Sequence, residues 1–210
     1  MTKKVLAVEL SKLKVFENPS RNLEQYPTDS EVAADALWMA NLNGWIFGNV
    51  LDLGAGTGIL GIGCILLGAK DVEFLDNDAK ALKTLNENLD ALNDEFEIDA
   101  KITVTNSEFT SPSKKHYDLI VMNPPFGTQE KNIDTEFLKA ALRNSNKVIT
   151  FHKAITKKYI DGLIKTEGFK IKGYYEYDFP LKSTMPDHKK HIERIKVGCW
   201  HLEKKVLLQT

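Results

Sequence analysis

Short apolar runs alternate with amphipathic stretches along most of the chain. Runs of strand length occupy residues 50–53, 71–76, 117–122 and 147–151. Between them, apolar side chains recur at helical spacing over residues 78–92, 134–146 and 156–167. The run at 117–122 is almost unbroken, as is typical of a strand covered on both faces. This alternation predicts a mostly parallel sheet with helices on both sides.

The two ends of the chain extend this pattern. Helical spacing over residues 5–16 and from Val32 to Ala40 predicts two N-terminal helices, the second capped by Asp29 or Ser30. Residues 98–105 predict a strand at the sheet edge, and residues 169–177 and 192–200 predict a final pair of strands. We therefore expect an α/β fold with a seven-stranded, mostly parallel sheet and one antiparallel edge hairpin. Residues 1–210 are expected to form one domain, with residues 1–45 as a helical extension.

A glycine-rich stretch follows the first strand. The sequence Gly54-Ala-Gly56-Thr-Gly58 lies between an apolar run and an apolar helix that begins at Ile59. Glycine permits positive φ angles and lets a ligand approach the backbone, and the helix start offers free N–H groups. Asp76 ends the next strand, near the spacing at which a carboxylate meets ribose hydroxyls in doubly wound folds. The stretch predicts a nucleotide site, although glycines that merely turn a strand into a helix would look alike.

The glycine stretch resembles the first motif of class I methyltransferases that use S-adenosylmethionine. Ile59 stands where the dinucleotide fingerprint has glycine or alanine, which disfavours a nicotinamide dehydrogenase. The resemblance implies a Rossmann-like fold. Many such enzymes bind the cofactor's adenine through an acid after the third strand, and here Ser107, Glu108 or the backbone would replace it. The implied cofactor residues in this part of the chain are Asp52, Gly54, Gly56, Thr57, Gly58, Ile59, Asp76, Ser107 and Glu108.

A second motif, Asn123-Pro-Pro-Phe126, follows the strand at 117–122. Ligands of open α/β sheets bind at the carboxyl ends of strands. Pro124 and Pro125 lack N–H donors and stiffen the loop, which leaves the Asn123 amide oxygen and the Pro124 carbonyl as fixed acceptors. These suit the two protons of an exocyclic NH2 group, with Phe126 stacked on its ring. Asn123 to Phe126 are thus the candidate catalytic residues, unless they only end a strand beside a core phenylalanine.

The chain as a whole resembles the methyltransferase-like protein 5 family. The matching segments are Gln25-Tyr-Pro-Thr28, residues 52–58, residues 123–127, His152-Lys153 and His188-Lys-Lys190. The resemblance implies methylation of N6 of one adenosine in small-subunit ribosomal RNA, together with a small zinc-binding activator subunit. It also implies that Gln25 and Thr28 bind the methionine end of the cofactor, with Asn123 at the same site. Ala55 and Thr57, where relatives carry cysteine, and Ser107 depart from the pattern.

Basic residues after strand ends and in the late loop are the candidate RNA contacts. Specific RNA recognition favours unpaired bases stacked on aromatic rings, a role that suits Phe126. Charge runs are, however, often only solvated faces. The candidates are His152, Lys153, Lys182, His188, Lys189 and Lys190, together with Phe126.

Composition limits the possible RNA contacts, metal sites and cellular location of the protein. The net charge of −1 requires any RNA contact to be a local patch. Cys64 and Cys199 lie in apolar stretches, so we expect reduced core thiols, a cytoplasmic protein and no metal site. We expect no membrane span and no signal peptide. The activator would pair with the edge strand at 101–105. Two alternatives remain: a protein glutamine N5-methyltransferase, and a cofactor-binding ribosome assembly factor with little activity.

Overall fold

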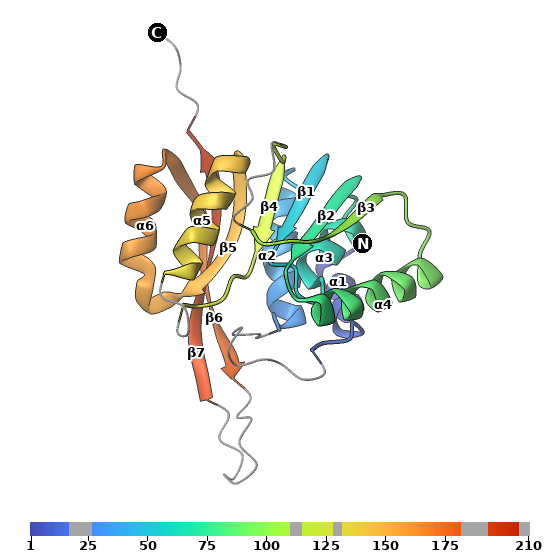
Figure 1. Ribbon diagram of the computed structural model, residues 1–210. Coiled ribbons are helices and arrows are strands. Elements are labelled where there is room, and N and C mark those ends of the chain that lie inside the picture. The colour runs from blue at the N-terminus through green and yellow to red at the C-terminus, as the bar shows by residue number, and fades with distance from the viewer. Residues whose placement is uncertain (17–26, 110–114, 128–131, 182–192, 206–210) are drawn as a thin grey trace.

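A seven-stranded sheet forms the centre of the molecule (Figure 1). The computed structural model describes residues 1–16, 27–109, 115–127, 132–181 and 193–205. The strand order is β3-β2-β1-β4-β5-β7-β6, and among these described strands β7 alone runs opposite to the others. This confirms the predicted parallel sheet with one antiparallel edge hairpin. The strands are β1 (Asn49–Leu53), β2 (Asp71–Asp76), β3 (Lys101–Asn106), β4 (Leu119–Met122), β5 (Lys147–Lys153), β6 (Phe169–Leu181) and β7 (Glu193–Lys204).

Helices cover both faces of the sheet. One hydrophobic cluster joins the sheet to α1, α2, α3 and α4, and a second cluster joins the opposite face to α5 and α6. Within the described residues, no helix combines the length and apolar character that crossing a membrane requires. The helices are α1 (Lys3–Ser11), α2 (Ser30–Leu42), α3 (Ile59–Leu66), α4 (Ala79–Glu95), α5 (Ile133–Asn144) and α6 (Lys157–Thr166), with a 3-10 turn η1 (Ala154–Thr156) before α6.

Several element boundaries differ from those predicted. The first helix ends at Ser11 instead of Phe16, because the chain turns away and the backbone of Lys14 bonds to a side chain of α4. Strand β3 begins at Lys101, where its N–H meets the Lys70 carbonyl, and not at Ile98. Both hairpin strands are longer than predicted, since β6 continues to Leu181, opposite Glu193, and β7 continues to Lys204, opposite Phe169.

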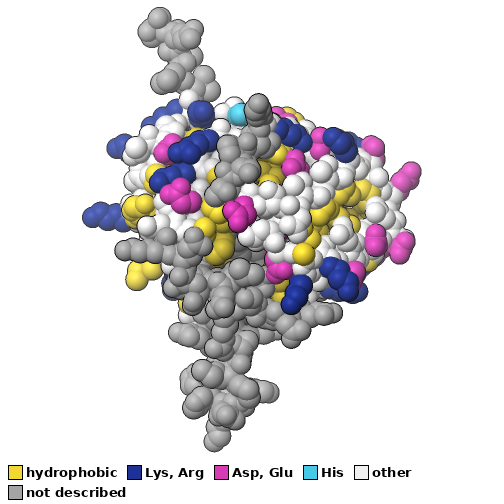
Figure 2. All heavy atoms as spheres, viewed as in Figure 1, with side chains coloured by type: hydrophobic (Ala, Val, Ile, Leu, Met, Phe, Trp, Pro, Cys, Tyr) yellow, Lys and Arg dark blue, Asp and Glu magenta, His cyan; other side chains and the backbone are white. Residues whose placement is uncertain are grey.

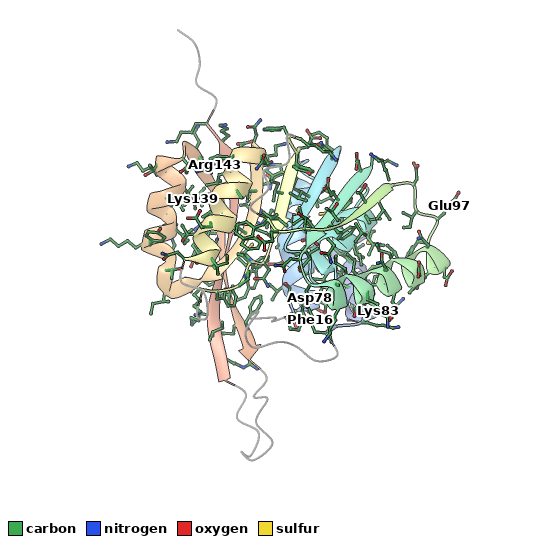
Figure 3. All side chains as sticks on the ribbon, in the orientation of Figure 1. Phe16, Asp78, Lys83, Glu97, Lys139 and Arg143 are labelled. Carbon is green, nitrogen blue, oxygen red and sulfur yellow. The ribbon has the colours of Figure 1, made fainter. Side chains whose placement is uncertain are left out.

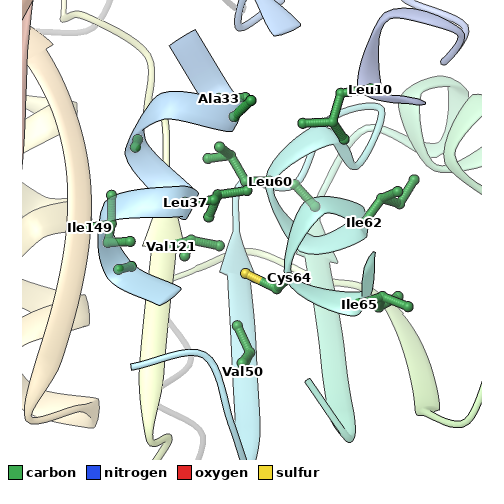
Figure 4. Close-up of a cluster of buried hydrophobic side chains, with 14 of the residues drawn as sticks. Leu10, Ala33, Leu37, Val50, Leu60, Ile62, Cys64, Ile65, Val121 and Ile149 are labelled. Carbon is green, nitrogen blue, oxygen red and sulfur yellow. The ribbon is translucent and has the colours of Figure 1, made fainter. Parts of the chain in front are cut away.

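Helix α3 packs closely between the sheet and the N-terminal helices (Figure 4). Leu60 and Cys64 on α3 belong to the same buried cluster as Leu37 on α2 and Val50 on β1. Gly61 makes this closeness possible, because a Cβ added there would lie 2.2 Å from Cε1 of Phe74 on β2. The start of α3, and with it the glycine-rich turn, is therefore held against the sheet.

The hairpin is tied to the N-terminal helices by a polar contact. The Tyr177 hydroxyl on β6 and the Lys3 ammonium group on α1 both donate to the carboxylate of Asp35 on α2, each at 2.8 Å. Nearby, His201 on β7 is buried between the rings of Trp45 and Tyr175. Burial lowers the pKa of His201 to about 4, although the negative charge of Asp35 opposes this shift. His201 is therefore neutral in the folded protein at pH 7.

Aromatic residues of the hairpin pack against one another and against the sheet. The rings of Tyr174 and Trp200 lie 4.7 Å apart between their centroids, and Phe179 is buried against Phe151. Cys64 and Cys199 are both buried free thiols.

The close packing of α3 predicts opposite effects for two glycine substitutions. Gly61→Ala should lower the free energy of unfolding by about 1–3 kcal/mol, because the added methyl group forces the Phe74 ring to move. Gly162→Ala on α6 should raise it by roughly 0.5–1 kcal/mol, because a Cβ there meets no atom within 4 Å. Urea unfolding of both variants measures the difference, and equal stability would contradict the packing argument.

The buried His201 predicts a specific acid sensitivity. Its folded-state pKa lies below the unfolded value, so its contribution to stability is complete above pH 6.5 and is lost as the pH falls toward 4. A shift of this size corresponds to a loss on the order of 3 kcal/mol. Unfolding of His201→Gln followed from pH 7 to pH 4 should show a shallower loss than the parent protein. The exposed-site control His116→Gln should retain the parent slope.

Candidate active site

The glycine-rich turn connects β1 to α3 at the carboxyl end of the sheet. Gly54, Gly56 and Gly58 have φ angles of +72°, +54° and +91°. In this region a side chain would strain the backbone, so the predicted need for glycine is confirmed. The N–H groups of Gly54 and Ala55 donate to the Leu75 carbonyl at 2.8 and 3.0 Å, which joins the turn to β2.

The carboxylates of Asp52 and Asp76 fix the glycine-rich turn and the start of α3. Asp52 is buried, and its Oδ2 accepts the Gly61 N–H at 2.8 Å. Burial raises the pKa of Asp52 to about 8, and the Gly61 bond only partly offsets this. Asp76 accepts the N–H groups of Gly56 and Asp78, both at 2.8 Å, and burial raises its pKa as well. Asp76 therefore links the turn to the start of α4.

The turn is also bound to the N-terminal extension through Asn88, which sequence reasoning missed. This buried residue on α4 donates to the carbonyls of Thr57 and Lys14, each at 3.0 Å, and accepts the Lys14 N–H at 2.8 Å. Phe16 follows: a Cβ added at Gly56 would lie 2.9 Å from the Phe16 ring, and Figure 3 shows Phe16 beside the start of α4. Asn88 could have been identified from the sequence as a polar residue within the apolar stripe of α4.

A second bond joins the extension to the Asn-Pro-Pro-Phe loop. The Asn123 Nδ2 group donates to the Thr28 hydroxyl at 2.9 Å, although the residues are 95 positions apart. The Asn123 Oδ1 atom is buried and has no hydrogen-bond partner within the described part of the chain. Thr28 is buried just before α2, whose first turn is capped by Asp29. Gln25 lies outside the described residues.

Phe126 is less accessible than a stacking platform requires. Its side chain is 8% exposed and belongs to the cluster that packs against α1 to α4. The Lys153 Nζ atom lies 6.0 Å from the centroid of its ring. Stacking on a substrate base would require the ring to move outward from this position.

His152 was predicted to contact RNA, which would require it to lie on the surface, but the structure places it in the interior. It is fully buried, with Nε2 2.8 Å from the Thr150 hydroxyl and Nδ1 3.4 Å from Asp134 Oδ2. Its ring also packs edge-on against Trp200. The prediction that His152 contacts phosphate is wrong, because β5 is an interior strand covered on both faces. The other predicted basic contacts, Lys182, His188, Lys189 and Lys190, lie outside the described residues.

Two aromatic rings near Gly54 were not predicted as site residues. Phe109 and Phe137 stack with their ring centroids 3.8 Å apart, and Phe137 Cε1 lies 3.0 Å from the position of a Cβ at Gly54. Ser107 follows β3 and donates its backbone N–H to the Asp76 carbonyl at 3.0 Å. Glu108 is exposed.

Comparison with known proteins agrees with this architecture. Residues 30–149 match the family described as methyltransferase small domain. An uncharacterized protein of Methanocaldococcus jannaschii is 34% identical, with 96% of this chain and 94% of that protein covered. The Drosophila melanogaster rRNA N(6)-adenosine-methyltransferase Mettl5 is 32% identical, with 90% of both chains covered.

A solved structure extends the likeness to three dimensions. A protein of Pyrococcus horikoshii, provisionally described as an RNA methyltransferase, is 37% identical and superposes with a TM-score of 0.87, covering 98% of this chain and 100% of that one. On the fold, the glycine-rich turn and these relatives together, the chain belongs to the methyltransferase small domain family and, within it, to the methyltransferase-like protein 5 family.

Proposed function

We propose that this protein transfers the methyl group of S-adenosylmethionine to N6 of an adenosine in small-subunit ribosomal RNA. The observation that carries the proposal is the buried Oδ1 atom of Asn123, which has no hydrogen-bond partner among the described residues. Leaving a buried acceptor unpaired costs about 1–3 kcal/mol, so such an atom at the carboxyl end of a strand suits a ligand donor. The named relatives are rRNA N6-adenosine-methyltransferases, which supports an adenine amine as that donor.

The residues around the turn fit the cofactor. The positive φ angles of Gly54, Gly56 and Gly58 shape the turn, and Asp76 lies at the end of β2, where a carboxylate meets ribose hydroxyls. Thr57, Ile59, Ser107 and Glu108 complete the proposed set at this end of the sheet. Phe109, which is partly exposed and stacks on buried Phe137, offers an apolar surface for the adenine ring. Asp52 is buried behind the turn and acts by holding α3 in place.

The N-terminal extension contributes to the same site. Asn88 and Phe16 bind one end of it to the glycine-rich turn, and Thr28 binds the other end to Asn123. We therefore propose that Thr28, together with Gln25, holds the methionine end of the cofactor. Residues 1–45 and the sheet would then act as one domain.

The cofactor supplies an activated methyl group on a sulfonium centre. Asn123 Oδ1 and the Pro124 carbonyl accept the two protons of the adenine N6 group, which turns the nitrogen lone pair out of the ring plane. The bond to Thr28 holds the Asn123 amide group, and the fixed φ angle of Pro125 restricts the Pro124 carbonyl. No strong base is needed, since the proton can leave after the methyl group has transferred. Alignment of this kind can lower a reaction barrier by roughly 7–11 kcal/mol.

Lys153 supports an RNA substrate on electrostatic grounds. Its ammonium group lies above the Phe126 ring, next to the proposed adenine position. We retain Lys182, His188, Lys189 and Lys190 as proposed phosphate contacts. The two buried free thiols are consistent with the cytoplasm as the proposed compartment.

We also propose that a small zinc-binding activator subunit pairs with β3. This strand forms one edge of the sheet, and no strand of the described residues pairs with the backbone groups on its outer side. The N–H groups of Lys101 and Ser107 point inward and donate to the carbonyls of Lys70 and Asp76. Because N–H groups alternate in direction along a strand, those of the even-numbered residues between them point outward.

A proline substitution tests the pairing with the activator. Val104→Pro should abolish the complex because it removes an outward N–H donor from β3. Val104→Ala is the matched control, since it shortens the same side chain but keeps the donor. Native mass spectrometry and zinc analysis of protein isolated from its own cells measure the complex. Retention of a small zinc-containing subunit by Val104→Pro would contradict pairing at this edge.

Substitution of Asn123 tests the catalytic proposal. Asn123→Ala should lower kcat for methyl transfer into ribosomal RNA about 10²- to 10³-fold at saturating cofactor, as for loss of other oriented catalytic hydrogen bonds. Asn43→Ala, at an exposed position, should leave kcat unchanged. The measurement follows labelled methyl groups into RNA and into polypeptide. Label in glutamine would favour the protein methyltransferase, and full RNA methylation by Asn123→Ala would overturn the mechanism.

A further inference from the structure

The turn after β5 exposes a large apolar side chain next to the active site. Ile155 in η1 is 91% exposed, more than any other large apolar side chain that the structure describes. The turn is rigid, because the Thr156 hydroxyl donates to the Lys153 carbonyl at 2.8 Å and α6 follows without a break. Single exposed apolar residues are common, so exposure alone does not indicate a binding role for Ile155, and its position must be considered.

That position is beside the Asn-Pro-Pro-Phe loop. Strands β4 and β5 are parallel neighbours, with Met122 paired to Thr150, so the residues that follow each strand lie at the same edge of the sheet. Lys153 bridges the two segments, since its Nζ atom lies 6.0 Å from the Phe126 ring centroid. Ile155 follows Lys153 by two residues and therefore lies at the same end of the sheet as the proposed adenine position.

Further side chains extend the apolar and basic character of this turn. Tyr159 on the first turn of α6 is 57% exposed, and Lys158 beside it is exposed and forms no ion pair with a described residue. Cations in the first turn of a helix are unfavourable with respect to the helix dipole, so Lys158 does not serve helix stability. Figure 2 shows acidic and basic side chains interspersed over the described part of the visible face, so a basic site must be local.

We propose that this surface, formed by Lys153, Ile155, Lys158 and Tyr159, binds the nucleotide adjacent to the target adenosine. The inference rests on the proposed RNA substrate. An adenosine that leaves its stack exposes the face of its neighbour, and an apolar or aromatic side chain can cover that face. Ile155 and Tyr159 take this base, and Lys153 and Lys158 contact the flanking phosphates. The two cations favour a polyanion over a glutamine-bearing peptide.

Substitution of Ile155 tests the surface against a matched control. Ile155→Ser should weaken binding of a single-stranded ribosomal RNA oligonucleotide containing the target adenosine about 5- to 20-fold, as loss of one stacked base does elsewhere. The KM for RNA should rise by the same factor, while kcat and cofactor affinity remain unchanged. The control is Leu42→Ser, which removes a 65% exposed side chain at the far end of α2 and should bind RNA normally.

Two further variants separate stacking from charge. Ile155→Trp should restore or tighten binding, because a larger ring covers more of the base. Lys158→Gln should lower the slope of log affinity against log salt by about 1 unit. Parent-like affinity and KM in Ile155→Ser would overturn the proposal.

The binding measurement also separates this inference from the proposed function. Fluorescence polarisation of the oligonucleotide requires no methyl transfer, so an inactive parent protein that binds RNA through Ile155 would overturn only the function. Normal RNA methylation by Ile155→Ser with unchanged KM would overturn only the surface. A parent protein that does not bind RNA, or a loss of glutamine-peptide binding in Ile155→Ser, would overturn both.

Discussion

The buried hydrogen bond between the Asp52 carboxyl group and the Gly61 N–H is the constraint on which the site depends. It joins the end of β1 to the first turn of α3, across a turn that contains three glycines with positive φ angles. Glycine has the greatest backbone freedom to lose on folding, so such a turn needs fixed ends. Burial of Asp52 and the close contact of Gly61 with Phe74 provide them.

Long-range polar ties then build the rest of the site around this turn. Asn88 connects α4 with the turn and with Lys14, and Thr28 connects the extension with Asn123. Both are contacts of side chains in buried surroundings, where a hydrogen bond is stronger and an unpaired group more costly than at the surface. The extension is thereby placed at the carboxyl end of the sheet, with Phe16 against Gly56.

The Asn-Pro-Pro-Phe loop, which we propose to be catalytic, follows β4 and has the turn after β5 as its neighbour in the sheet. Buried His152 links β5 to Asp134 at the start of α5. This contact supports the carboxyl end of β5, where Lys153 and Ile155 lie. The hydrogen bond from His152 lowers the pKa of Asp134 although burial opposes this, so the contact favours the charged carboxylate. The pair formed by His152 and Asp134 thus supports the proposed surface of Lys153, Ile155, Lys158 and Tyr159.

Local sequence patterns were enough to predict the β/α order, the parallel sheet, the glycine turn and the segment that holds the candidate catalytic residues. These follow from local periodicity, from the φ angles that only glycine adopts readily, and from the missing N–H groups of proline. Three features became visible only in the folded molecule: His152 is buried, Asn88 and Thr28 bind the extension to the site, and Phe137, with Phe109 stacked on it, lies beside Gly54. The physical reason is that burial and pairing between residues far apart in the chain depend on how the elements pack, which local pattern does not encode.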